Sequence, residues 1–340
     1  METITIRGNM GASSILIGEH LENLHRYVPV SRTIIITDVN VHEIYRLNTM
    51  ADDVITIGTG EKIKTLETVG DIYAQLVSLK ADRSSFIVGI GGGIVCDIAG
   101  FVASTFLRGV RFGFVATTLL AQVDASVGGK NGVNYGGYKN MVGVFNQPEF
   151  VICDPDLLKS LPQRERLCGF AEIVKHAAIA DADLFAYLEQ NYKSAHALDS
   201  QVIEKLVVDS VTIKSSIVNR DETERGERRI LNFGHTFGHA IEKATGVPHG
   251  EAVSRGMVIA SALSVRRAHL TTAEDQRLKA LLHNLKLPTR LESEPRRILE
   301  ALGKDKKRED NCINFVLLHK IGNAIVDKIS FEELKDAIDG

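Results

Sequence analysis

The sequence predicts an α/β N-terminal domain with a mostly parallel sheet, residues 1–158, followed by an all-α C-terminal domain, residues 159–340. Three observations support this fold class. Short apolar runs alternate with segments of helical spacing in the first half, which is typical of a parallel sheet with crossover helices. From about residue 155 the apolar residues recur with a period near 3.6. The length of 340 residues suffices for one large or two medium domains.

The first half contains four predicted buried strands, each ending in glycine or polar residues. Because open α/β sheets bind ligands at the carboxyl ends of their strands, we expect a binding site at that edge. The chain also begins with residues that alternate like a strand. The four strands are predicted at 34–36, 54–57, 86–88 and 114–116, with helices at 63–80 and 94–107.

The second half is predicted to be helical, with one short strand near its end. Two runs of charged residues, 220–229 and 304–310, are read as solvated faces or loops unless individual residues bind an anion. The helices are predicted at 165–180, 182–192, 199–221, 230–245, 250–268 and 272–284, and the strand at 314–318.

The charge balance excludes several function classes. With 40 basic and 43 acidic residues the net charge is −3, whereas nucleic-acid and membrane-surface proteins carry a basic excess. No run of 18 apolar residues occurs, so no membrane span is predicted. The four cysteines match no zinc or disulfide spacing and indicate reduced thiols. Without a signal-peptide pattern at the start, we expect a cytoplasmic protein.

A triple glycine, Gly91–Gly93, follows the third strand and opens a helix. Glycine lets the backbone approach a diphosphate, and the helix N-terminus supplies N–H donors. A tight turn explains three glycines equally well, because the pattern is not GxGxxG. Asp38, Glu61 and Lys64 follow neighbouring strands, however, and a carboxylate there can bind ribose hydroxyls. Dinucleotide binding is therefore the favoured interpretation.

A long glycine-rich segment, 121–148, carries Asp124, Lys130, Lys139 and Asn140. Glycines and lysines in one loop can wrap an anion. The alternative is a flexible surface loop with solvated lysines. Loops of this length are usually functional, which favours the anion-binding interpretation.

Three histidines raise the possibility of a metal site. His235 and His239 lie one helical turn apart, a recognised ligand spacing, although core or capping histidines share it. Gly234 and Gly238 flank the pair, so something should approach this backbone closely. His249, and Glu172 from an earlier helix, could complete a set with open coordination positions.

Two lysines lie on predicted helices. Lys175 shares a face with Glu172 and His176, which an exposed intrahelical ion pair would explain. Lys214 lies on a mainly apolar face, where an ammonium group is costly unless it meets an anion. Its side chain can equally extend to solvent.

Taken together, these residues resemble the 3-dehydroquinate synthase family over essentially the whole chain. The resemblance implies an N-terminal nucleotide-binding domain, a C-terminal helical domain and an active site in the cleft. Two departures are Cys96, where glycine is usual, and Ser160, where a threonine contacts the cofactor. The matching stretches are Gly91–Phe101, Leu107–Phe112, Thr117–Lys130, Lys139–Gln147, Ala171–Lys175, Leu231–Glu242, His249–Gly256 and Asp305–Lys307.

The resemblance also implies roles for individual residues. It gives Glu172, His235 and His249 as ligands of a divalent metal, zinc or cobalt, and assigns His239 to the substrate phosphate. Arg108 is expected to reach the partner subunit's site, since the family is dimeric. NAD contacts fall on Asp38, Glu61, Lys64, Gly92, Gly93, Ile94, Asp97, Thr117, Thr118, Leu120, Lys139 and Ser160. Substrate contacts fall on Asp124, Lys130, Asn140, Lys175, Lys214, Arg228, Asn232, His239 and Lys306.

The implied reaction converts 3-deoxy-D-arabino-heptulosonate 7-phosphate to 3-dehydroquinate and phosphate. It proceeds by transient oxidation by NAD, elimination of phosphate, re-reduction and intramolecular aldol closure. One alternative is a related sugar-phosphate cyclase with another substrate. Another is a metal-dependent polyol dehydrogenase, which would accumulate NADH. The partner implied is a small sugar-acid phosphate, with no nucleic acid and no membrane.

Overall fold

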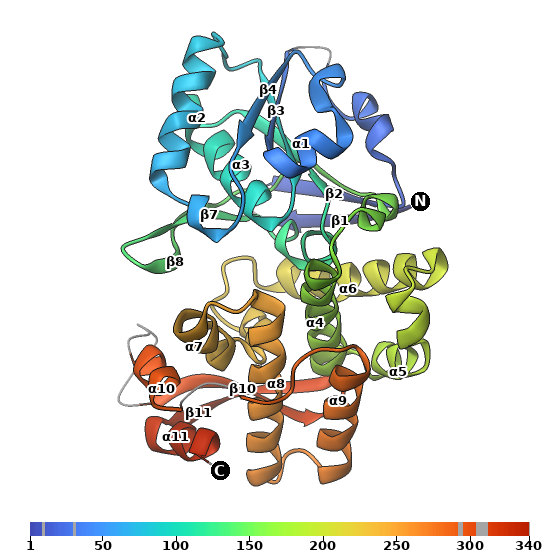
Figure 1. Ribbon diagram of the computed structural model, residues 1–340, viewed down its shortest axis with the longest axis vertical. Coiled ribbons are helices and arrows are strands. Elements are labelled where there is room, and N and C mark those ends of the chain that lie inside the picture. The colour runs from blue at the N-terminus through green and yellow to red at the C-terminus, as the bar shows by residue number, and fades with distance from the viewer. Residues whose placement is uncertain (9–10, 30–31, 292–294, 304–311, 340) are drawn as a thin grey trace. The chain divides into compact units, whose positions relative to one another are not determined.

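The computed structural model describes residues 1–8, 11–29, 32–291, 295–303 and 312–339, and the chain divides into two compact units (Figure 1). Unit 1 contains Met1–Pro162 and Lys214–Thr223, and unit 2 contains Gln163–Ile213 and Glu224–Gly340. The helix α6 (Ser200–Arg220) therefore contributes to both units. Within the described ranges, no helix is long and apolar enough to cross a membrane.

Unit 1 is built on a seven-stranded sheet with the order β1-β2-β9-β6-β5-β3-β4. Apart from the antiparallel pair β1–β2, neighbouring strands are parallel, as predicted. The four strands predicted from the sequence correspond to β3, β4, β5 and β6. The strands are β1 (Glu2–Gly8), β2 (Gly11–Ile17), β3 (Thr33–Asp38), β4 (Asp53–Ile57), β5 (Phe86–Gly91), β6 (Arg111–Ala116) and β9 (Phe150–Cys153).

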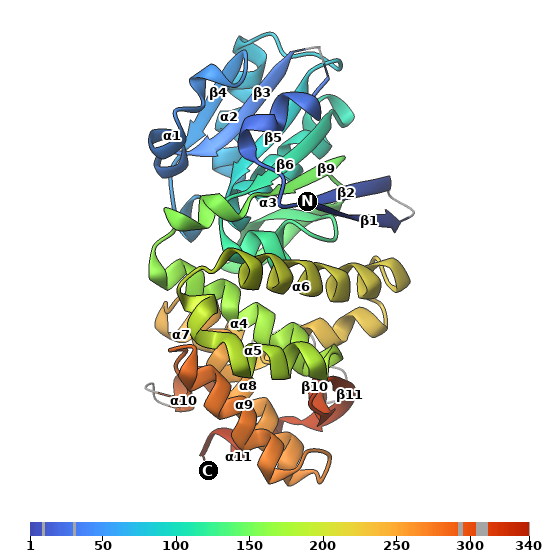
Figure 2. The same cartoon turned by 90° about the vertical axis from the view of Figure 1, so that its right-hand side faces the viewer.

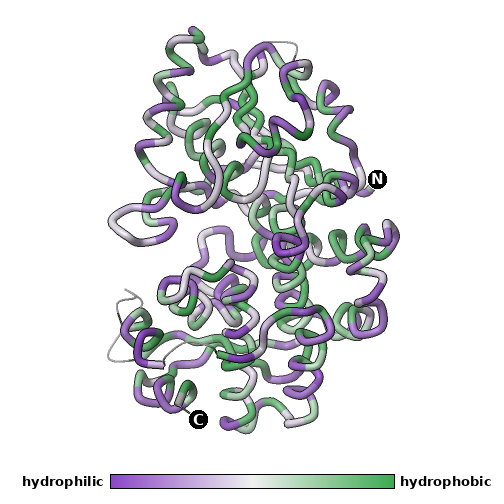
Figure 3. The backbone as a smooth tube through the Cα atoms, in the orientation of Figure 1, coloured by the Kyte–Doolittle hydropathy of each residue, from purple (hydrophilic) through white to green (hydrophobic). Residues whose placement is uncertain are grey.

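Both faces of this sheet are covered, which explains why its central strands read as continuous apolar runs. Val88 and Ile90 of β5 belong to one buried cluster with Val41 of α1. Gly89, between them, faces the other side, where a Cβ would lie 2.9 Å from the Cβ of Ala99 in α3. The central strands of the seven-stranded sheet accordingly appear mainly hydrophobic in Figure 3. The α-helices of unit 1 are α1 (Val39–Tyr45), α2 (Leu66–Ser78) and α3 (Gly93–Thr105).

The segment 121–148, predicted as a loop, is largely ordered into regular structure. It begins with a π-helical turn, η5 (Ala121–Ala125), and continues as an antiparallel hairpin of β7 (Lys130–Tyr135) and β8 (Tyr138–Phe145). Gly136 and Gly137 form its two-residue turn, both with positive φ. The loop prediction was therefore wrong for this hairpin, which packs against α3.

Short helical turns complete unit 1 and lie mostly at the ends of its strands. They are the 3-10 turns η1 (Leu21–Arg26), η2 (Leu47–Thr49), η3 (Glu61–Ile63), η4 (Phe106–Arg108) and η6 (Pro155–Lys159).

Unit 2 is mainly helical, as predicted, and Figure 2 shows α4, α5, α8 and α9 packed beside one another. The predicted helix 230–245 is divided in two, because Gly234 has φ +76° and interrupts the helical backbone. Its parts are the 3-10 turn η7 (Glu227–Asn232) and α7. The α-helices are α4 (Gln163–Ala180), α5 (Ala182–His196), α7 (His235–Thr245), α8 (His249–Arg266), α9 (Thr272–Asn284), α10 (Pro295–Gly303) and α11 (Phe331–Asp339).

A two-stranded sheet corrects the all-α description of the C-terminal part. The strand predicted at 314–318 lies within β10 (Cys312–Lys320), which pairs with β11 (Asn323–Ser330). Gly322, with φ +83°, lies in the turn between them. The partner strand was missed, because its alternation Asn-Ala-Ile-Val-Asp-Lys-Ile is interrupted by charged residues.

Candidate active site

Three side chains of unit 2 converge to form a candidate metal centre. Glu172 of α4 is fully buried, and its Oε1 lies 3.1 Å from His249 Nε2 and 3.5 Å from His235 Nε2. One ligand atom from each residue lies within 4.8 Å of the others. One oxygen and two imidazole nitrogens are donors that suit zinc or cobalt. The residues present therefore fit the metal that the sequence predicted.

Helix packing places these three residues. His235 and His249 are the first residues of α7 and α8, so both imidazoles lie at helix starts. A Cβ on Gly250 would lie 2.3 Å from Cα of Cys168, so only glycine lets α8 begin this close to α4. Glu172 follows Cys168 by one helical turn on α4. The glycine contact thus brings His249 within reach of the carboxylate.

The glycines beside His235 serve helix packing rather than a ligand. A Cβ on Gly238 would lie 3.2 Å from Cα of Val253, and a Cβ on Gly234 would lie 2.9 Å from the Val253 carbonyl oxygen. Both contacts involve the backbone of α8. The close approach that the sequence predicted is therefore made by a neighbouring helix.

The second ring nitrogen of each histidine faces an oxygen atom. His235 Nδ1 lies 3.2 Å from the Phe233 carbonyl oxygen, and His249 Nδ1 lies 3.7 Å from Glu242 Oε2, which is an ion-pair distance. Partners at this nitrogen favour a ring orientation that directs Nε2 toward a metal. Glu242 was not among the predicted site residues. The sequence pattern that could have indicated Glu242 is its position about two helical turns after His235, on the same face of α7.

The two imidazoles differ in protonation. Burial lowers the pKa of His235 well below its usual value, despite the attraction of Glu172. Burial also opposes protonation of His249, but its contacts with Glu172 and Glu242 outweigh this and raise its pKa to about 9. His235 is thus neutral and ready to coordinate, whereas His249 must release a proton when a metal binds.

Further predicted residues of unit 2 surround this cluster. Lys175 forms an ion pair with Glu172, and both side chains are buried, so the exposed ion pair considered from the sequence is wrong. The His239 ring centroid lies 5.4 Å from that of His235, yet His239 is not among the three clustered ligands. Arg228 is 2% exposed. Lys306 lies outside the described residues.

Asn232 has a partner that sequence reasoning missed. Its Nδ2 donates a hydrogen bond of 2.5 Å to Glu224 Oε1. Glu224 has φ +59° and lies in the charge run 220–229. The interpretation of this run as a solvated loop therefore fails at Glu224 and at the buried Arg228.

In unit 1 the predicted cofactor residues meet where the strand order reverses. The chain runs from β3 to β4 on one side and then from β5 to β6 and β9 on the other. Nucleotides bind at such switch points, outside the carboxyl ends of the strands. Asp38 ends β3, and Gly91 ends β5. Thr37 Oγ1 joins the two strands by donating to the Ile90 carbonyl oxygen at 2.8 Å.

The start of α3 is built for close backbone approach. Its N-cap, Gly92, provides no side-chain cap for the first-turn N–H groups. A Cβ on Gly93 would lie 2.8 Å from the Cβ of Ala125, so this position is tightly enclosed. Uncapped N–H groups at a helix N-terminus attract phosphate oxygens. Asp38 is partly committed elsewhere, because its Oδ1 accepts from the N–H of Asn40 and Val41 and caps α1.

Four predicted cofactor residues, Glu61, Lys64, Asp97 and Lys139, and the predicted substrate residue Asn140 gather at the hairpin. Lys64, 4% exposed, pairs with Asp97, and its Nζ donates to Asn140 Oδ1 at 2.5 Å. Burial raises the pKa of Asp97, although Lys64 opposes this. Lys139 Nζ lies 3.5 Å from Glu61 Oε1. The structure thus brings these five residues together.

Lys214 resolves the choice left open by the sequence. The residue is 6% exposed, and its Nζ lies 2.7 Å from Asp124 Oδ1. The ammonium group therefore meets an anion within unit 1 and does not extend to solvent. Asp124 lies in the π-helical turn η5, a type of irregularity that is frequent at functional sites.

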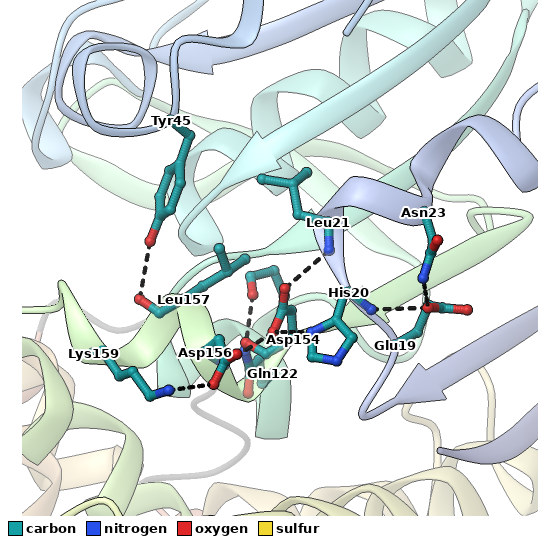
Figure 4. A network of polar contacts seen from close by, with 11 residues as sticks. Glu19, His20, Leu21, Asn23, Tyr45, Gln122, Asp154, Asp156, Leu157 and Lys159 are labelled. Carbon is teal, nitrogen blue, oxygen red and sulfur yellow. Dashed lines mark hydrogen bonds and ion pairs between the residues drawn. The ribbon is translucent and has the colours of Figure 1, made fainter.

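Ser160 is held by the polar network at the end of β9. Its hydroxyl lies 2.8 Å from the Tyr45 hydroxyl, which also donates to the Leu157 carbonyl oxygen at 3.2 Å. Asp154 accepts from the Leu21 N–H at 2.9 Å and contacts His20 (Figure 4).

His20, Asp154 and Asp156 form another group with ligand atoms within 4.8 Å of one another. Their oxygens already serve the fold. Asp154 caps η6 by accepting from the N–H of Asp156, and Asp156 pairs with Lys159 at 2.7 Å. We therefore interpret this group as a structural network.

The remaining predicted residues of unit 1 lie along the same strand ends or on its surface. Thr117 is buried at the end of β6, and Thr118 Oγ1 accepts from the Ala121 N–H at 3.1 Å. Arg108 and Lys130 are exposed. Ile94 and Leu120 are half-buried.

Comparisons with known proteins identify the family and the relatives of this chain. Residues 54–168 match the family described as 3-dehydroquinate synthase N-terminal, and residues 169–308 match 3-dehydroquinate synthase C-terminal. A 3-dehydroquinate synthase of Dehalococcoides mccartyi is 41% identical over 324 residues, which cover 92% of this chain and 90% of the relative.

Two solved structures share the fold and carry ligands. A 2-deoxy-scyllo-inosose synthase complexed with carbaglucose-6-phosphate, NAD⁺ and Co²⁺ is 28% identical with a TM-score of 0.90 and 99% coverage of both chains. A 2-epi-5-epi-valiolone synthase of Streptomyces hygroscopicus with bound NAD⁺ and Zn²⁺ is also 28% identical. Its TM-score is 0.84, with 90% of this chain and 89% of that chain covered.

Proposed function

The chain belongs to the 3-dehydroquinate synthase family, and on this premise we propose that it converts 3-deoxy-D-arabino-heptulosonate 7-phosphate to 3-dehydroquinate and phosphate. It is thus a carbon–oxygen lyase of the shikimate pathway. The observation that carries the proposal is the convergence of Glu172, His235 and His249 within one buried cluster. A phosphate-eliminating cyclase needs such a cluster, whereas a simple hydrolase would not need the cofactor residues of unit 1.

The metal and the cofactor supply chemistry that no side chain here can supply. A divalent ion held by Glu172, His235 and His249 would polarise substrate hydroxyl and carbonyl oxygens. NAD, bound at the β3–β5 switch point, would accept and return a hydride. Uncapped N–H groups at the start of α3 would bind its diphosphate. Oδ2 of Asp38, which has no hydrogen bond among the described residues, would bind its ribose.

The chain's own residues bind and orient the substrate. We propose that Arg228 and Lys214 bind the carboxylate, for which the guanidinium fork of arginine is suited. Lys130, Lys306 and His239 would bind the phosphate. Asp124, Asn140, Lys175 and Asn232 would fix the hydroxyl groups. Most of these groups already have partners, as Lys214 has Asp124 and Asn232 has Glu224. Substrate groups would replace these partners. Because the side chains are already held in place, their loss of conformational entropy on binding would be small.

We also propose that the enzyme acts as a homodimer in the cytoplasm. Leu107 and Arg108 both have positive φ, at 50° and 71°, in the exposed turn η4. This strained backbone holds Arg108 outward, where it would reach the phosphate of the partner subunit's site. Light scattering should give a mass twice that of one chain. The four free cysteines fit a reducing compartment.

The deciding experiment is a phosphate-release assay with the heptulosonate phosphate, with and without a chelator. We expect phosphate release without net accumulation of NADH, and loss of release after chelation. Accumulation of NADH with a simple polyol would indicate a dehydrogenase instead. Faster release from a hexose 6-phosphate would indicate a cyclase like the inosose synthase.

A further inference from the structure

Unit 2 contains a small cavity that none of the predicted site residues lines. Its volume is about 200 Å³. It lies where the first turns of α4 meet the last residue of α5 and the residues that follow α9. The lining residues are Gln163, Arg166, Leu167, Phe170, His196 and Lys286.

The cavity is positively charged and has no acidic lining residue. Neither Arg166 nor Lys286 forms a side-chain hydrogen bond or ion pair with any residue in the described part of the chain. Arg166 Nε is nevertheless buried without a hydrogen-bond partner. Leaving a buried charged donor unsatisfied is costly, so the Arg166 guanidinium is placed as though to meet a negative ligand, with the exposed ammonium group of Lys286 beside it.

His196 adds a third polar side chain to the lining, and the shift of its pKa indicates the sign of the local field. Its Nε2 is buried without a hydrogen-bond partner, and its ring packs edge-on against Phe170 with centroids 5.6 Å apart. Burial lowers the pKa of His196, and the charges of Lys286 and Arg166 lower it further. Contacts with the backbone of Asn284 and Leu285 oppose this only in part. The field at the imidazole is therefore net positive.

We propose that this cavity binds a compact tetrahedral oxyanion, with orthophosphate as the simplest ligand. Arg166 and Lys286 would neutralise its charge, and the amide group of Gln163 would donate to one of its oxygens. Nε2 of the neutral His196 imidazole would accept a hydrogen bond from the P–OH of hydrogen phosphate. The volume is below the roughly 300–1,000 Å³ typical of sites for larger organic ligands, which excludes a nucleotide. This inference does not depend on the proposed function, because Glu172, His235 and His249 do not line the cavity.

A structural explanation competes with this proposal. The cavity lies near the carboxyl ends of α5 and α9, whose carbonyl groups carry partial negative charge that cations can offset. That role requires neither a cavity nor a buried unpartnered Nε. It also predicts that removal of the cations lowers stability without changing anion binding.

The test measures phosphate binding to the enzyme loaded with NAD and metal, by equilibrium dialysis. We expect the double variant Arg166→Gln/Lys286→Gln to lose one bound phosphate per chain, and each single variant to weaken that site about tenfold. Lys193→Gln, which removes an exposed charge from the same α5, is the matched control and should change nothing. Equal stoichiometry and affinity in the double variant would overturn the proposal, even if its melting temperature fell.

A second measurement uses the unaltered protein, in case the double variant does not fold. Acetylation of each lysine is followed by peptide mass spectrometry with and without phosphate. Phosphate should slow modification of Lys286 but not of Lys193. Equal rates at Lys286 in both conditions would contradict the site. Stronger displacement of phosphate by malonate than by sulfate would overturn the assignment to a tetrahedral ligand.

Discussion

The candidate metal centre of unit 2 and the candidate nucleotide site of unit 1 differ in which atoms form them. In unit 2 the metal cluster consists of side chains, with Glu172, His235 and His249 contributed by three helices. In unit 1 the nucleotide end of the sheet consists largely of backbone, with Gly92 and Gly93 leaving the first N–H groups of α3 uncapped. A site made of side chains fails when atoms are deleted. A site made of glycine backbone fails when atoms are added.

The largest effect should come from deleting a ligand. We expect His235→Ala to lose bound metal and to lower the rate of phosphate release at least about a thousandfold, because polarisation of the substrate oxygens is lost. Metal content and the phosphate assay measure both effects, and circular dichroism should show a retained fold. His283→Ala, on the exposed face of α9, is the control. An active, metal-free His235→Ala enzyme would refute the metal assignment.

The next effect tests the glycine backbone at the start of α3 by adding one methyl group. Gly93→Ala places a Cβ 2.8 Å from the Cβ of Ala125, so the start of α3 or the turn η5 must shift. We expect NAD affinity to fall about a hundredfold, which corresponds to about 2.7 kcal/mol, with unchanged metal content. Fluorescence titration with NADH measures the affinity.

Gly70→Ala on α2 is the matched control for this variant. Its added Cβ would meet nothing within 4 Å, so NAD affinity should not change. Equal affinity in the Gly93→Ala and Gly70→Ala proteins would show that the start of α3 does not bind the cofactor.

A smaller effect concerns the orientation of a ligand. Glu242→Gln keeps the shape of the side chain that faces His249 Nδ1 but removes its charge. We expect metal affinity to fall about 10–100-fold, as for other partners of metal-binding histidines. Competition with a fluorescent chelator measures the affinity. Glu189→Gln on α5, whose partner is Arg277, should retain full affinity. An equal loss of metal affinity in the Glu242→Gln and Glu189→Gln proteins would show that Glu242 has no specific role in metal binding.

The smallest effect is expected in the scaffold of unit 1 and should alter stability alone. Hydrogen bonding from Tyr27 lowers the pKa of Glu19 from 4.5 to about 2, although burial opposes this. A pKa that is lower in the folded state stabilises the fold above pH 4.5, and this contribution is lost as pH falls toward 2. It amounts to at most about 3 kcal/mol.

Urea unfolding of the native protein and of Glu19→Gln at pH 7 and pH 3 tests this expectation. The difference between their unfolding free energies should shrink at pH 3. A constant difference would show that the Glu19 carboxylate does not contribute through its charge.

The sequence predicts the alternating strands and helices well, because burial on both sheet faces gives long apolar runs. It fails at the β7–β8 hairpin, where Gly132 and Gly143 face each other: a Cβ on Gly132 would lie 2.6 Å from the Val142 carbonyl oxygen. No apolar alternation can mark such strands. The turn residues Gly136 and Gly137 between two tyrosines were the available signal.

For the metal centre, the sequence identifies chemistry but not geometry. The spacing of His235 and His239 is visible because both lie on one helix. The choice of His249 depends on packing between α8 and α4, which spacing cannot show. Glu172 and Lys175 look like an exposed pair in the sequence, since only the fold reveals that both are buried. Resemblance to a family supplied what periodicity could not.

The helix α6 has a practical consequence for anyone who wishes to produce one half of this protein alone. Unit 1, which carries the candidate nucleotide site, is discontinuous in the sequence, because it contains Lys214–Thr223 in addition to Met1–Pro162. A fragment stopped at Pro162 would lack the ammonium group that meets Asp124 at 2.7 Å. A fragment that represents this unit should therefore also contain residues 214–223, joined to the first 162 residues by a linker.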